Sequence, residues 1–186
     1  MLKRPELLSP AGNLTKLKIA LEYGADAVYG SVASFSLRTR SAREFNLETF
    51  KEAIDYTHEK GKKFYATINA FPFNSQIEPL KRHLQTISAM KPDAFIIATP
   101  GVMSLAKEIA PDIEIHLSTQ ANVMNVLDAK IYHDMGAKRI VVAREMNLKD
   151  VIKIKEEIPT LDIEIFVHGS RCFAYSGRWL VSSVQS

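Results

Sequence analysis

Among its 186 residues the sequence has one cysteine, Cys172, and one tryptophan, Trp179. A single cysteine excludes an intrachain disulfide framework, which indicates a reducing compartment. The N-terminus lacks the apolar segment of a signal peptide, and no apolar run approaches the roughly 18 residues of a membrane span. We therefore expect a cytoplasmic protein without membrane contact.

Strong net charge and several common catalytic motifs are also missing. The 24 basic and 21 acidic residues leave a charge of +3, which by itself does not indicate nucleic-acid binding. No G-x-G-x-x-G follows the first predicted strand, which disfavours a dinucleotide site. No H-E-x-x-H spacing supports a metalloprotease site, and no Ser-His-Asp triad is evident.

What the sequence contains is a repeated alternation of short apolar runs with helical periodicity. The run at 94–98 is continuously apolar, and the run at 139–143 is apolar after Arg139, as in strands of a parallel sheet covered on both faces. Asn13, Asn46 and Asn147 precede helical patterns as N-caps. The expected strands cover residues 6–8, 25–29, 63–69, 94–98, 113–117, 139–143 and 163–167, and further helices are expected over 76–90, 100–110 and 123–135.

Two architectures have this α/β pattern, an open doubly wound sheet and a TIM-like (β/α)8 barrel. We favour the barrel, because polar residues follow strand after strand and a barrel gathers all these strand ends on one face. Seven β-α units are present, so the barrel is incomplete unless residues 180–184 supply an eighth strand. We expect residues 1–186 to form a single barrel-like domain, the N-terminal part of a longer protein.

Two histidines and a glutamate at predicted strand ends are the candidate catalytic residues: His116, His168 and Glu145. A histidine there can act as general acid or base or bind a metal, or it can be a hydrogen-bonded loop residue. Glu145 is either a base or the ion-pair partner of the adjacent Arg144.

Other polar residues near the strand ends are candidates for substrate binding. A guanidinium at Arg144 suits a carboxylate or phosphate, and the arginine cluster that includes Arg38 suits phosphates. Asn69 and Gln120 can orient a carbonyl or satisfy loop backbone groups. Tyr175 is assigned to substrate binding with them.

Cys172 is a nucleophile, a soft-metal ligand or a small apolar filler. His168 lies four residues before it, at a spacing open to a nucleophilic Cys–His pair. A centre held by four thiolates cannot form from a chain with one cysteine.

Six motifs, in order along the chain, together resemble the collagenase-like peptidase family U32. They are L-L-S-P-A-G-N at 7–13, Y-G-A-D-A-V-Y-G at 23–30, F-S-L-R at 35–38, H-L-S-T-Q-A-N at 116–122, R-I-V-V-A-R-E at 139–145 and V-H-G-S-R-C-F-A-Y-S-G-R at 167–178. The resemblance implies either a peptidase or a hydroxylation factor. The hydroxylation factors that this resemblance brings in modify one of three targets. These are a wobble uridine of tRNA, which is modified using prephenate, a cytidine of ribosomal RNA, and ubiquinone precursors.

In the hydroxylation factors that the family includes, four cysteines hold an iron–sulfur cluster. The resemblance assigns Cys172 to the first ligand, and Trp179 stands where the second is expected. We therefore expect no cofactor in this chain, and a cluster only in full-length relatives.

The favoured function is RNA hydroxylation with a small carboxylate such as prephenate. The alternatives are peptide hydrolysis and a non-catalytic binding module. The corresponding partners are tRNA or ribosomal RNA with a small carboxylate, or a peptide. An incomplete barrel exposes apolar edges, so we also expect self-association.

Overall fold

The computed structural model describes residues 4–32, 45–169 and 175–177, in which strands and helices alternate. The strands are β1 (Leu8–Pro10), β2 (Ala27–Gly30), β3 (Lys63–Ile68), β4 (Ala94–Ile97), β5 (Glu114–Leu117), β6 (Arg139–Val141) and β7 (Asp162–Glu164). The α-helices are α1 (Leu14–Glu22), α2 (Leu47–Glu59), α3 (Ile77–Ser88), α4 (Pro100–Ile109), α5 (Val126–Asp134) and α6 (Leu148–Glu157). Two 3-10 turns, η1 (Asn74–Gln76) and η2 (Thr119–Ala121), precede α3 and α5.

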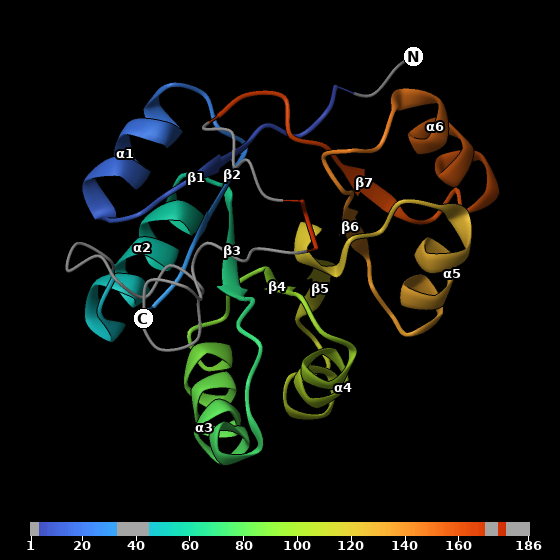
Figure 1. The fold of residues 1–186 in the computed structure, drawn as a ribbon. Coiled ribbons are helices and arrows are strands. Elements are labelled where there is room, and N and C mark those ends of the chain that lie inside the picture. Colours follow the sequence, from blue (N-terminus) through green and yellow to red (C-terminus); the bar gives the residue numbers. More distant parts are fainter. Residues whose placement is uncertain (1–3, 33–44, 170–174, 178–186) are drawn as a thin grey trace.

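The sheet confirms the barrel-type architecture. Its seven strands are all parallel, and their spatial order is their sequence order, β1 to β7. A doubly wound sheet reverses its strand order near the middle, which this sheet does not. Figure 1 shows the strands as a curled sheet with the helices on its outer side, a half-barrel. Residues 180–184, the candidate eighth strand, lie outside the described residues.

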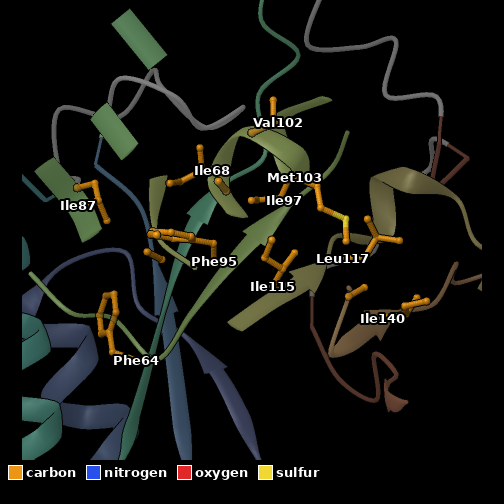
Figure 2. Packing of buried hydrophobic residues seen from close by; sticks show 14 of the residues in the cluster. Phe64, Ile68, Ile87, Phe95, Ile97, Val102, Met103, Ile115, Leu117 and Ile140 are labelled. Carbon is orange, nitrogen blue, oxygen red and sulfur yellow. The ribbon is translucent and has the colours of Figure 1, made fainter. Parts of the chain in front are cut away.

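The outer face of the sheet carries the main core. Alternate residues of each strand point to opposite faces, so Phe95 and Ile97 of β4 pack under the helices while Ala94 and Ile96 face the barrel interior. Figure 2 shows the outer layer around Phe95, Ile97 and Ile115. Strand β4 is thus buried on both faces, as its continuous apolar run predicts.

Local capping chemistry sets the helix starts. The side chains of Asn13, Asn46 and Asn147 each accept a backbone N–H bond from three residues further on, as predicted. Helix α5 begins at Val126 rather than at residue 123, because Asn125 caps it in the same way. A side-chain cap of this kind contributes about 1 kcal/mol.

Within the described residues, no helix combines the length and apolar composition needed to cross a bilayer. Strands β1 and β7 are the two ends of the described sheet. Self-association of these edges stays a prediction.

Candidate active site at the carboxyl ends of the strands

The carboxyl ends of the parallel strands meet on one rim of the half-barrel, and most candidate residues lie there. Asn69 follows β3, Gln120 lies in the turn after β5, and Arg144 with Glu145 follows β6. Barrel enzymes place their sites at this rim. Arg38 and Cys172 lie outside the described residues.

Arg144 and Glu145 are joined to the turn at residues 175–177 by Ser176. The Ser176 hydroxyl oxygen accepts hydrogen bonds from the Arg144 backbone N–H at 3.1 Å and from Arg144 Nε at 3.2 Å. The Ser176 backbone N–H donates to Glu145 Oε1 at 3.0 Å. Ser176 is fully buried, so this contact fixes the guanidinium and the carboxylate relative to the turn.

The pKa of Glu145 lies below its usual value. Partial burial opposes ionisation, but hydrogen bonds from the side chain and backbone of Ser176 and the charge of Arg144 outweigh it. Glu145 is therefore a carboxylate at neutral pH, a weak base that orders the loop.

Gly177 allows the same turn to approach the segment after β5. A Cβ atom on Gly177 would lie 2.6 Å from the Cβ of Asn122. Asn122 itself adopts the left-handed conformation, with φ of 57°, which asparagine tolerates better than most residues. The hydroxyl of Tyr175 donates to Met124 Sδ at 2.8 Å. The three motifs at 116–122, 139–145 and 167–178 thus converge here.

Ser176 is the site residue that the sequence analysis did not single out. The motif at 167–178 that contains Ser176 is evident in the sequence, but serine is common in turns. Only the long-range contact with Arg144 distinguishes Ser176. Gln120 is buried beside Ser118, with the Ser118 hydroxyl 3.4 Å from Gln120 Oε1. Gln120 therefore supports the rim loop.

The two candidate histidines lie in different environments. His116 is inside β5 and 1% exposed, with its ring centroid 4.5 Å from that of Tyr65. It thus lies on the inner wall of the half-barrel rather than in the rim loops. His168 lies beyond the end of β7 and is exposed.

The two histidines and Glu145 do not form a metal site. In the described part of the chain, no three His, Cys, Asp or Glu side chains gather closely enough to hold a metal ion. The metal site considered for His116, Glu145 and His168 is therefore absent from these residues.

A charged cluster occupies the inner wall beside His116. Arg139 donates to Glu6 Oε1 at 2.6 Å, and the Tyr65 hydroxyl donates to the same oxygen at 2.7 Å. Arg139 also lies 3.7 Å from Glu164 Oε2. We call Glu6, Tyr65, Arg139 and Glu164 the inner cluster. It connects the segment before β1 with β3, β6 and β7.

Burial sets the protonation of the inner wall. Burial, with the positive charges of Arg139 and Lys63, lowers the pKa of His116 to about 3, so the imidazole is neutral. Burial raises the pKa of Glu164 to about 7 against the opposing charge of Arg139. The pKa of Glu6 is lowered, because hydrogen bonds from Arg139 and Tyr65 outweigh its burial.

Replacing Glu164 with glutamine is expected to stabilise the protein at alkaline pH. The folded-state pKa of about 7 exceeds the ordinary 4.5, so the folded form binds more protons between these values. Stability therefore falls as pH rises through this window. Glutamine removes the penalty, a gain of about 1–3 kcal/mol near pH 8 and about zero near pH 4. Urea unfolding at both pH values measures it, and equal stability of the two proteins throughout would contradict it.

An iron–sulfur centre needs more thiolates than this chain has. Such clusters are held by about four cysteine thiolates, and the chain supplies only Cys172. The residues present therefore do not hold a cluster by themselves. Ligands for one would have to come from outside these 186 residues.

Comparison with known proteins gives the family. The family model described as Peptidase family U32 matches residues 12–186. The chain is 65% identical over 180 residues to tRNA hydroxylation protein P of Helicobacter pylori, covering 97% of this chain and 43% of that protein. It is 44% identical over 179 residues to tRNA hydroxylation protein P of Escherichia coli, covering 96% of this chain and 39% of the relative.

A ribosomal RNA enzyme and a solved structure extend the comparison. A 23S rRNA 5-hydroxycytidine synthase of Escherichia coli is 35% identical over 183 residues, which cover 98% of this chain and 27% of the synthase. The U32 peptidase Mk0906 has a similar fold, with a TM-score of 0.70 at 16% identity over 89% of this chain and 70% of that one. The chain spans less than half the length of these curated relatives. Because the family model covers nearly all of it, the chain belongs to peptidase family U32.

Proposed function

We propose that this chain forms part of an RNA hydroxylation factor that acts on tRNA, with a wobble uridine as the target. The observation that carries the proposal is the 65% identity, over 97% of the chain, to a protein named for tRNA hydroxylation. The proposal includes a small carboxylate such as prephenate as co-substrate. It also makes residues 1–186 one domain of a longer protein that supplies the other iron–sulfur ligands.

The sequence of the segments that follow the strands supports a polyanionic substrate. The segments that follow the seven strands are 11–13, 31–46, 69–76, 98–99, 118–125, 142–147 and 165–186. In sequence they contain two acidic residues, Glu44 and Glu145, against 21 in the chain. Their basic side chains are all arginines, at positions 38, 40, 43, 144, 171 and 178, with no lysine. The guanidinium of arginine can donate two parallel hydrogen bonds to a phosphate.

Arg144 is the described member of this arginine set, and its geometry suits anion binding. Its Nε is held by Ser176 at 3.2 Å, which fixes the plane of the guanidinium. A guanidinium has five N–H donors, so a fixed plane can present paired donors to a phosphate or carboxylate. We assign Arg144 to the contact with the phosphate or carboxylate. His116 lies on the inner wall with a neutral imidazole, and we assign it a hydrogen-bonding role rather than a charged one.

Peptide hydrolysis has less support from the residues that the structure describes. Ser176, the rim serine that contacts Arg144, is fully buried. Its hydroxyl oxygen accepts two N–H bonds from Arg144, which does not suit a nucleophile. His58 lies 2.9 Å from Asp93, but Asp93 precedes β4, at the opposite end of the barrel from the rim. The Asp93 carboxylate also accepts a hydrogen bond from the Phe64 backbone N–H at 2.8 Å, so the pair holds the start of β3.

Nucleoside analysis tests the proposed function. In cells lacking the gene for the protein that carries this chain, we expect tRNA to lose a uridine nucleoside that bears one extra oxygen atom. Restoring the full protein should restore this nucleoside, and the Arg144→Leu form should not. Unchanged tRNA and ribosomal RNA nucleosides in the deleted cells would contradict the proposal, whereas a change confined to ribosomal RNA would correct its substrate.

A further inference from the structure

Two phenylalanines project from the rim loop after β3. Phe71 is 53% exposed and Phe73 is 77% exposed. They lie in residues 69–76, the loop that joins the carboxyl end of β3 to α3, drawn in green in Figure 1. Burying an aromatic side chain of this size is worth about 2 kcal/mol, so two exposed rings in one short loop need a reason.

The loop holds these rings outward by specific backbone contacts. The Phe73 backbone N–H donates to Gln76 Oε1 at 2.8 Å, and the Gln76 backbone N–H donates to the Phe73 carbonyl oxygen, also at 2.8 Å. This pair closes η1, which leads directly into α3. Pro72, between the two rings, restricts the backbone further. The rings are therefore presented on an ordered loop, at low entropy cost for a partner that contacts them.

The segments around the rings carry no negative charge that would oppose a polyanion with flat bases. Residues 69–76 contain no charged side chain, and neither do the neighbouring segments 98–99 and 118–125. No carboxylate in these segments would repel a phosphate backbone. Asn74 and Ser75 flank the rings with exposed amide and hydroxyl groups, which suit the edges of bases. An apolar protein partner would instead be matched by further aliphatic residues in the same loop.

We infer that Phe71 and Phe73 form a stacking platform for unpaired bases of the RNA substrate, on the same rim of the half-barrel as Arg144. This inference rests on the proposed function. Bases of single-stranded RNA loops stack on exposed aromatic rings, whereas bases of a duplex are already stacked on one another. The platform thus selects RNA whose target nucleotide lies in an unpaired loop. Stacking positions that loop without distinguishing one base from another.

Binding of RNA by the full protein tests the platform. Phe73→Ala and Phe71→Ala are each expected to weaken binding of a tRNA stem-loop by about 5- to 100-fold. Phe73→Trp is expected to keep or strengthen binding, and Phe73→Leu to weaken it as alanine does. Tyr23→Ala is the matched control, since Tyr23 is 87% exposed and follows α1 at the opposite end of the barrel. A blunt-ended RNA duplex without unpaired bases should bind all these proteins alike.

Three outcomes would overturn the inference. Equal stem-loop affinity of Phe73→Ala and Tyr23→Ala would show that the ring does not contact RNA. Full affinity in Phe73→Leu would show an apolar contact rather than stacking. A lower melting temperature of Phe73→Ala with unchanged RNA affinity would show that the rest of the protein covers the ring. If the wild-type protein hydroxylates RNA in each case, the proposed function stands and the platform alone fails.

Discussion

Replacing Arg139 with methionine is expected to lower the free energy of unfolding by about 3–5 kcal/mol. The guanidinium is the positive charge at the centre of the inner cluster, 2.6 Å from Glu6, 3.7 Å from Glu164 and 5.4 Å from the centre of the Tyr65 ring. Its side chain is only 12% exposed. Methionine fills the space but leaves two carboxylates on the inner wall without a counter-charge.

Urea unfolding near pH 8, where both carboxylates of the wild-type protein are ionised, measures this effect. Asp162→Asn is the matched control, because Asp162 also approaches Arg139, at 3.9 Å, but is 55% exposed. Its loss should cost about 0–1 kcal/mol. If the methionine variant is destabilised no more than this control, the inner cluster does not hold the half-barrel together. In the double variant with Glu6→Gln, the loss should be smaller than the sum of the two single losses.

Replacing Ser176 with alanine is expected to lower RNA hydroxylation by about 10- to 100-fold in the full protein. The hydroxyl fixes the Arg144 guanidinium and backbone together, and a misplaced anion-binding group costs rate even when the fold survives. The lost stability should be about 1–3 kcal/mol, because the backbone N–H and the Nε–H of Arg144 both lose this acceptor. The fraction of hydroxylated nucleoside in tRNA, measured against protein level, checks this.

An independent change to the same turn should have the same effect. Gly177→Ala would push the turn away from Asn122, because the added Cβ would lie 2.6 Å from an Asn122 carbon atom. Ser88→Ala is the control, since the Ser88 hydroxyl donates to the Gln85 carbonyl within the last turn of α3, away from the rim. Full hydroxylation by Ser176→Ala and Gly177→Ala would remove this turn from the active site.

The strand order and helix starts were predictable because they depend on local patterns. Apolar runs mark the strands, asparagine caps mark α1, α2 and α6, and parallel strands with short connections follow one another around a barrel. The sheet confirms the barrel choice that rested on polar residues at successive strand ends.

The direction of individual side chains was harder to predict. His116 and Leu117 are adjacent in β5 and face opposite sides of the sheet, but buried apolar residues lie on both sides of this sheet. The sequence pattern therefore does not tell which side is the barrel interior. The tertiary contacts with Tyr65 and Arg139 decide it.

The contacts that build the rim site were also outside the reach of sequence patterns. Ser176 meets Arg144 across 32 positions of sequence, and no local periodicity encodes that pairing. Phe71 and Phe73 look like core residues by composition, and only their exposure distinguishes them. Both features depend on how the loops of different strands meet at one rim.

A chimera tests most directly the proposed role of this chain in RNA hydroxylation. The chain would replace the matching 180 residues of Helicobacter pylori tRNA hydroxylation protein P, to which it is 65% identical, in cells lacking that protein. We predict that the chimera restores the oxygenated nucleoside in tRNA. A folded chimera, present at the level of the intact relative, that leaves the tRNA unmodified would contradict the account.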